Sequence, residues 1–117
     1  MFALTRSMHY YLYPQSVDMR KGIWSLYEVI RAQMNRNPLS IEVFIFFGRR
    51  HDTIKLLHWE NDGFVLYCKK LSRGTFEVPP INPCSGHFQM PWSVFVLMME
   101  GVSIHSARHR KKFYLNN

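Results

Sequence analysis

Residues 42–78 decide the fold, and they read EVFIFFGRRHDTIKLLHWENDGFVLYCKKLSRGTFEV. Runs of β-branched, leucine and aromatic residues alternate in this stretch with turns rich in glycine, asparagine, aspartate and serine. Such a pattern predicts antiparallel strands joined by tight turns. We therefore expect a β-meander with strands near 42–47, 53–59, 64–70 and 75–79.

The turns of this meander differ in charge. Successive hairpin turns fall at alternate ends of a meander, so the turn at 60–63 would place Glu60 and Asp62 at one end of the sheet. The turns at 48–52 and 71–74 would share the other end, which would hold most of the nearby cations: Arg49, Arg50, Lys69, Lys70 and Arg73. The sequence therefore predicts a sheet with a cationic end and an acidic end, which is a directional surface for a polyanion.

The composition sets limits on the class of protein. A chain of 117 residues that is 47% apolar is long enough for one domain with its own core. A formal net charge of +7 favours an acidic partner, with nucleic acid ahead of an anionic membrane. The chain shows neither the apolar run of a membrane span nor a signal-peptide pattern. Two cysteines do not make a disulfide framework, so we expect a cytoplasmic protein with reduced thiols.

The rest of the chain predicts one strand and two helices around the meander. Residues 9–13 are aromatic and end at Pro14, which predicts a strand. Asp18 is placed to cap a helix over 18–35, and Pro91 to lie in the first turn of a helix over 91–100. We therefore expect a single α+β domain over 1–117, an antiparallel β-meander packed with two or three helices on one sheet face, and a basic segment from about 102.

Six cations of the meander form the first candidate site for nucleic-acid binding. A guanidinium group binds phosphate oxygens as a fork, whereas an ammonium group acts as a point charge. Several such groups on one surface would displace counterions from DNA. The competing interpretation is the ordinary charged rim of a soluble protein. The six residues are Arg49, Arg50, Lys55, Lys69, Lys70 and Arg73.

Two further basic groups extend this hypothesis. Arg20 and Lys21 would lie in the first turn of a helix, where cations oppose the macrodipole. A phosphate docked there would pair with them and with the exposed N–H groups, but Asp18 could equally neutralise them locally. The C-terminal segment would add sequence-independent affinity, or serve solubility only, through Arg108, Arg110, Lys111 and Lys112.

Metal and catalytic interpretations receive less support. Cys84 and His87, with His105 and His109, have spacings found in zinc sites, but no finger scaffold surrounds them. A metal nuclease needs carboxylates that converge on metal ions, and the eight acidic residues are scattered along the chain. No glycine-rich phosphate loop is present. We therefore predict no enzyme activity, no metal and no cofactor.

An ordered series of short motifs resembles a known family. The pieces are DMRKG at 18–22, VFIFFGRR at 43–50, KLLHW at 55–59, GF at 63–64, KKL at 69–71 and GTF at 74–76. Together they resemble the small TnpB accessory protein, the second open reading frame, of the insertion-sequence-sixty-six family of bacterial transposons, over about residues 9–101. The chain departs from the family pattern at Ser25 and His51, where glycine is usual, and at Lys70, where arginine is usual.

The resemblance implies a protein encoded beside a separate, larger transposase of the DDE type and needed for efficient transposition. It suggests either DNA binding or bridging to the transposase. We therefore predict a non-catalytic accessory protein that binds DNA through its basic surface and assists the transposase. The alternative is a protein-interaction module that docks on the transposase through Trp92, Phe95 and Met99 or through an open sheet edge, with little DNA affinity of its own.

Overall fold

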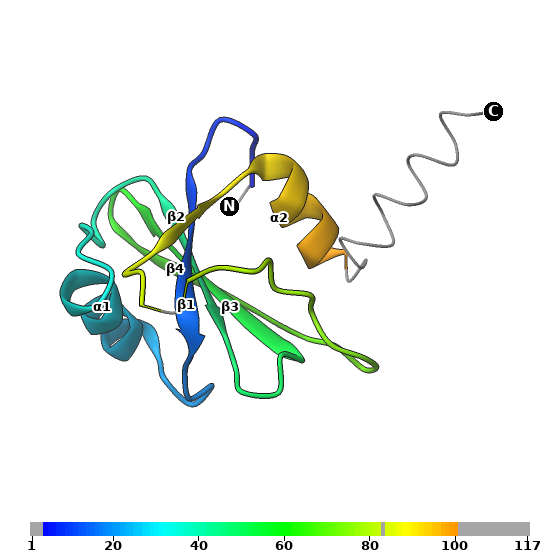
Figure 1. Ribbon diagram of the computed structural model, residues 1–117. Helices are drawn as coiled ribbons and strands as arrows, with labels where there is room; N and C mark the ends of the chain where they lie inside the picture. The colour runs from blue at the N-terminus through cyan, green and yellow to red at the C-terminus, as the bar shows by residue number, and fades with distance from the viewer. Residues whose placement is uncertain (1–3, 83, 101–117) are drawn as a thin grey trace.

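The computed structural model describes residues 4–82 and 84–100, which fold into a five-stranded sheet with two helices (Figure 1). The order of the strands across the sheet is β4-β3-β2-β1-β5. This architecture confirms the predicted α+β class. In chain order the elements are β1 (Tyr10–Ser16), α1 (Ile23–Ala32), β2 (Val43–Phe47), β3 (Thr53–Glu60), β4 (Gly63–Lys70), β5 (Phe88–Met90) and α2 (Trp92–Met99).

The predicted meander is confirmed over β2, β3 and β4, which pair antiparallel in sequence order. The fourth strand expected at 75–79 is wrong, because this segment folds back over the β2–β3 turn instead. Leu71 N–H donates to the carbonyl of Asp52, and Phe76 N–H donates to that of His51. The Phe76 ring is buried in the core. The prolines that follow could not have donated to a strand ladder.

The strand β1 pairs with β2 in parallel, which the purely antiparallel expectation missed. Parallel pairing requires a crossover, and the chain supplies one by passing through α1 between the two strands. The short β5 pairs antiparallel with the other edge of β1. The register of β1 shifts between Leu12 and Ser16, around Pro14, so β1 continues past the predicted 9–13. A proline is tolerated there because the regular ladder is interrupted.

The two helices cover opposite faces of the sheet, so the expectation that they share one face is wrong (Figure 1). The helix α1 packs Leu26 and Ile30 over Phe44 on one face. The helix α2 packs Phe95 over Tyr10 on the other, with the two rings stacked at 4.2 Å. Every residue of β2 is buried, which is what a strand covered on both faces requires.

The observed helix boundaries differ from the predicted ones for α1 and agree with them for α2. The helix α1 begins at Ile23 with Gly22 as its N-cap, five residues after the Asp18 predicted to cap it. Asp18 caps a turn instead, by accepting the N–H of Arg20. The helix α2 agrees with the expected 91–100 to within a residue, with Pro91 at its N-cap. Neither described helix has the length and apolar character needed to cross a membrane.

Candidate nucleic-acid interface

The strand register places oppositely charged turns at opposite ends of the sheet. Ser16 at the end of β1 lies beside Phe47 at the end of β2, and Thr53 at the start of β3 lies beside Lys70 at the end of β4. We call this the basic end: Ser16, the turn 48–52, Lys70 and the loop 17–20. The turn at 60–63 closes the far end of the β3–β4 hairpin, where Glu60 and Asp62 line a separate hollow.

The basic end contains an open hollow of about 580 Å³. Its walls come from the loop after β1, the β2–β3 turn and the last residue of β4, three segments that are distant in sequence. Four cations and two carboxylates lie around it: Arg20, Arg49, Arg50, Lys70, Asp18 and Asp52. The hollow therefore carries a surplus of positive charge, as the turn order predicted.

A close backbone approach builds the floor of this hollow. Val17 N–H donates to the carbonyl of Phe47 at 2.8 Å, which holds the loop after β1 against the end of β2. A Cβ on Gly48 would lie only 2.7 Å from Cγ of Met19. The glycine therefore leaves the space that the Met19 side chain fills. Sequence reasoning missed this contact, although a predicted β1–α1–β2 crossover would have placed the two segments together.

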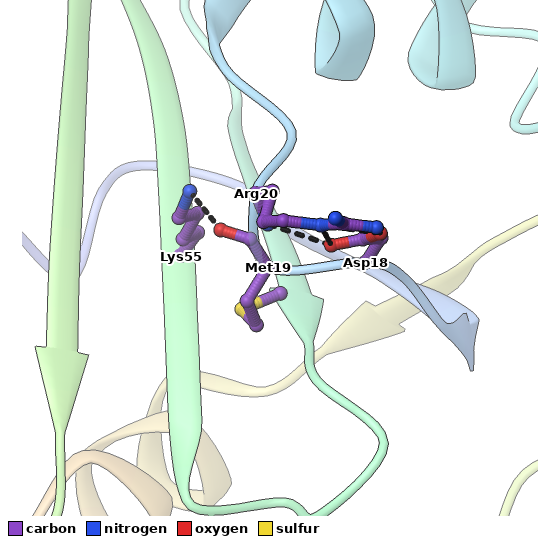
Figure 2. A network of polar contacts seen from close by, with 4 residues as sticks. All are labelled: Asp18, Met19, Arg20 and Lys55. Carbon is purple, nitrogen blue, oxygen red and sulfur yellow. Dashed lines mark hydrogen bonds and ion pairs between the residues drawn. The ribbon is translucent and has the colours of Figure 1, made fainter.

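Lys55 of β3 also binds this loop, and Figure 2 shows its side chain reaching the backbone of Met19. Its ammonium group donates to the carbonyl of Met19 at 2.7 Å and to that of Lys21 at 2.8 Å. In this structure its donors therefore serve the backbone of the loop, and its role as a phosphate ligand stays a prediction without support from this geometry. Lys21 itself is half-buried in the turn before α1.

Arg20 is neutralised locally by Asp18, which was one of the two alternatives open in the sequence. Its guanidinium group donates to the Asp18 carboxylate, with the shortest contact at 2.6 Å (Figure 2). These hydrogen bonds hold the pKa of Asp18 far below its usual range. Because Arg20 and Lys21 precede α1, they are not in its first turn, and the predicted phosphate at a helix N-terminus has no basis. The Arg20 side chain remains 91% exposed.

The neighbouring lysines of β4 point to opposite faces of the sheet, since side chains alternate along a strand. Lys69 donates to the carbonyl of Met99 at 2.7 Å, in the last turn of α2. A cation there also complements the helix dipole. Lys69 is thus engaged in the fold and lies outside the basic end, contrary to prediction. Lys70 is exposed and lines the hollow.

Four predicted phosphate ligands remain unengaged. Arg49, Arg50, Lys70 and Arg73 are exposed, and none makes a side-chain hydrogen bond or ion pair with another residue of 4–82 or 84–100. Arg73 does not line the hollow, but its loop is bonded to the β2–β3 turn through Leu71 and Phe76. The predicted basic tail lies outside the described residues: Arg108, Arg110, Lys111 and Lys112.

The remaining predicted residues have other roles. The Nδ1 of His87 lies 3.0 Å from the carbonyl of Met34, and its ring meets Tyr11 edge-on. His105 and His109 lie outside the described residues, within which no three potential metal ligands cluster. The proposed docking residues contribute to packing: Phe95 is buried and Trp92 packs on Tyr10.

Comparison with known proteins places these residues in a family. A family model described as IS66 Orf2 like protein matches residues 8–109. The chain is 26% identical over 102 residues to a Sinorhizobium fredii protein named y4jC, covering 87% of this chain and 86% of the relative. It is 36% identical over 62 residues to y4hO of the same organism, covering 53% of this chain and 54% of the relative.

No solved structure gives a significant match to the chain. The motifs 18–22 and 43–50, which carried the resemblance in the sequence, meet at the basic end of the sheet. Because the family model spans most of the sequence, the chain belongs to the IS66 Orf2-like family, the accessory proteins of IS66 transposons.

Proposed function

We propose that this protein is a non-catalytic accessory factor for DNA transposition that binds the DNA backbone at the basic end of its sheet and assists a separate transposase. The observation that carries the proposal is the set of three unengaged cations at that end, Arg49, Arg50 and Lys70, with a fourth, Arg73, in the neighbouring loop. Arg49 and Arg50 supply forked donors, and Lys70 and Arg73 add charge beside them. Membership of a transposon family supports the same direction.

The geometry suits backbone contacts rather than base reading. Three of the unengaged cations lie around an open hollow, on the β2–β3 turn and at the end of β4, and Arg73 lies in the adjacent loop, so none of the four lies on a helix that could enter a groove. Phosphate contacts position a protein on DNA but do not specify sequence. The acidic turn at the far end repels the same backbone and therefore orients the molecule. Arg20 contributes less, because Asp18 offsets its charge.

The experiment is a measurement of affinity for duplex DNA across a salt series, on protein freed of nucleic acid. Each phosphate contact releases counterions, and four contacts give a log–log slope of about −4. Contacts from the basic segment beyond 101 would steepen it. Affinity that does not change with salt, or no binding at low salt, would remove the proposal. Metal-dependent cleavage by the purified protein would contradict its non-catalytic part.

A further inference from the structure

The strand β4 ends the sheet, and no other strand of the described residues pairs with its outer edge. It is the outermost strand in the order β4-β3-β2-β1-β5 and runs for eight residues. Within residues 4–82 and 84–100, its backbone bonds only to β3. Long edges of this kind are usually shortened, covered or broken by proline, because they pair readily with another chain. From Gly63 to Cys68 this edge carries neither proline nor charge.

Exposed aromatic side chains flank the edge on both faces. Trp24 of α1 is 71% exposed and meets Phe64 edge-on at 5.8 Å, on the face covered by α1. Tyr67 is exposed on the opposite face, where side-chain alternation places it with Val65. A strand edge with no partner among the described strands and no charge from Gly63 to Cys68 is open to pairing with another chain.

The charges along this edge are self-complementary. Its first residues adjoin Asp62 in the β3–β4 turn, and its last residue is Lys70. A second copy related by a two-fold axis perpendicular to the sheet would run antiparallel, which brings each acidic end to the other's basic end. Opposite charges facing each other across strands are stabilising, and like charges are destabilising.

We propose that β4 pairs with β4 of a second copy, antiparallel and centred on Leu66, to give one continuous sheet across a homodimer. In this register Asp62 faces Lys70 of the partner subunit, and Val65 faces Tyr67 of the partner subunit. Leu66 faces Leu66 of the partner subunit on the two-fold axis. This pairing does not require DNA, and in the dimer it offsets the charge of Lys70, so that Arg49, Arg50 and Arg73 stay unpaired among the described residues of each copy.

The charge pattern selects this register among the possible ones. The two-fold axis keeps the α1-covered faces of both copies on the same side of the sheet. The alternative registers therefore differ from this one by a shift of two residues along β4. One alternative sets Lys70 against Phe64 of the partner subunit. The other sets Asp62 against Cys68 of the partner subunit. In neither alternative does Asp62 of the turn or Lys70 of β4 face an opposite charge, so the Leu66-centred arrangement is favoured.

Charge reversal tests the interface. Sedimentation velocity of the nuclease-treated full chain should show a dimer. Lys70→Glu and Asp62→Lys should each raise the dimer dissociation constant by about tenfold or more, because each change creates two like-charge pairs. The double variant Asp62→Lys/Lys70→Glu should recover the wild-type constant, and Arg73→Glu serves as a control outside the strand. A chain that stays monomeric up to about 100 μM, or single reversals without effect, would overturn the proposal.

Disulfide trapping tests the register separately. In a Cys68→Ser/Cys84→Ser background, Leu66→Cys places two thiols directly opposite each other on the axis. Oxidation should therefore give a covalent dimer rapidly, because facing residues have the Cβ separation that a disulfide needs. Tyr67→Cys in the same background is the matched control, since its partner-subunit counterpart lies diagonally across. Faster trapping through Tyr67→Cys, or none through either, would overturn the Leu66-centred pairing.

Discussion

At the scale of single residues, several residues of the family motifs hold the loop after β1 in place rather than bind a ligand. Lys55 bonds the loop after β1, and Gly48 leaves room for Met19 of that loop. The two arginines that follow Gly48, Arg49 and Arg50, are exposed beside these contacts. Sequence patterns could not separate these roles, because a lysine that donates to backbone carbonyls and one that stays in solvent have the same residue type.

Replacing Lys55 with methionine should destabilise the fold by about 2 kcal/mol, because two backbone carbonyls lose a charged donor while the apolar stem is kept. Urea unfolding at constant m-value measures the change. Lys70→Met is the matched control at an exposed site and should stay within about 0.5 kcal/mol of wild type. Equal stability of the two variants would contradict the role assigned to Lys55.

The pair Arg36–Glu42 should make stability depend on pH. Arg36 donates to the Glu42 carboxylate and stacks on Tyr11 at 3.8 Å, and the pair lowers the pKa of Glu42. A lowered pKa stabilises the fold above the unfolded value of about 4.3, and this stabilisation is lost as the pH falls through the folded pKa.

Replacing Glu42 with glutamine should therefore cost about 1–2 kcal/mol at pH 7 and much less near pH 3. Urea unfolding at the two pH values measures the difference. The control is Glu28→Gln, whose partner Arg31 is on the solvent-exposed surface of α1, so its effect should be slight at both. A deficit in Glu42→Gln that persists unchanged at pH 3 would contradict the assignment.

At the scale of elements, the sequence pattern predicted the strands that pair with their neighbours along the chain. The β2–β3–β4 meander follows from turn chemistry and alternation, and α2 from its proline start. The parallel β1–β2 pair and the second covered face depend on contacts between distant segments. The all-apolar run of β2 was the signal for two covered faces, because a half-exposed strand would alternate.

The same alternation separates the two lysines at the end of β4. Lys69→Met should loosen α2 by removing the donor to Met99, with hydrogen exchange in α2 faster than in wild type. Its DNA affinity should be nearly unchanged. Lys70→Met should do the reverse: α2 keeps its protection, and the salt slope of DNA binding falls by about one. An equal effect of both variants on DNA binding would contradict the placement of Lys69.

At the scale of the whole molecule, the described structure separates charge along the strand direction. One end holds Arg49 and Arg50 beside Lys70, and the other holds Glu60 and Asp62. Two-fold pairing through β4 would place the two basic ends at opposite ends of the continuous sheet, along the strand direction. If DNA binds at the basic end as proposed, such a dimer offers two separate binding surfaces for DNA.

The central claim is that DNA binds at the basic end, and two matched double variants test it most directly. Arg49→Gln/Arg50→Gln and Arg6→Gln/Arg31→Gln each lower the net charge by two, although Arg31 is paired with Glu28, and only the first two arginines lie at that end. Duplex affinity across a salt series should lose about two units of log–log slope in the first variant and keep its slope in the second. Equal losses in both variants would contradict the account.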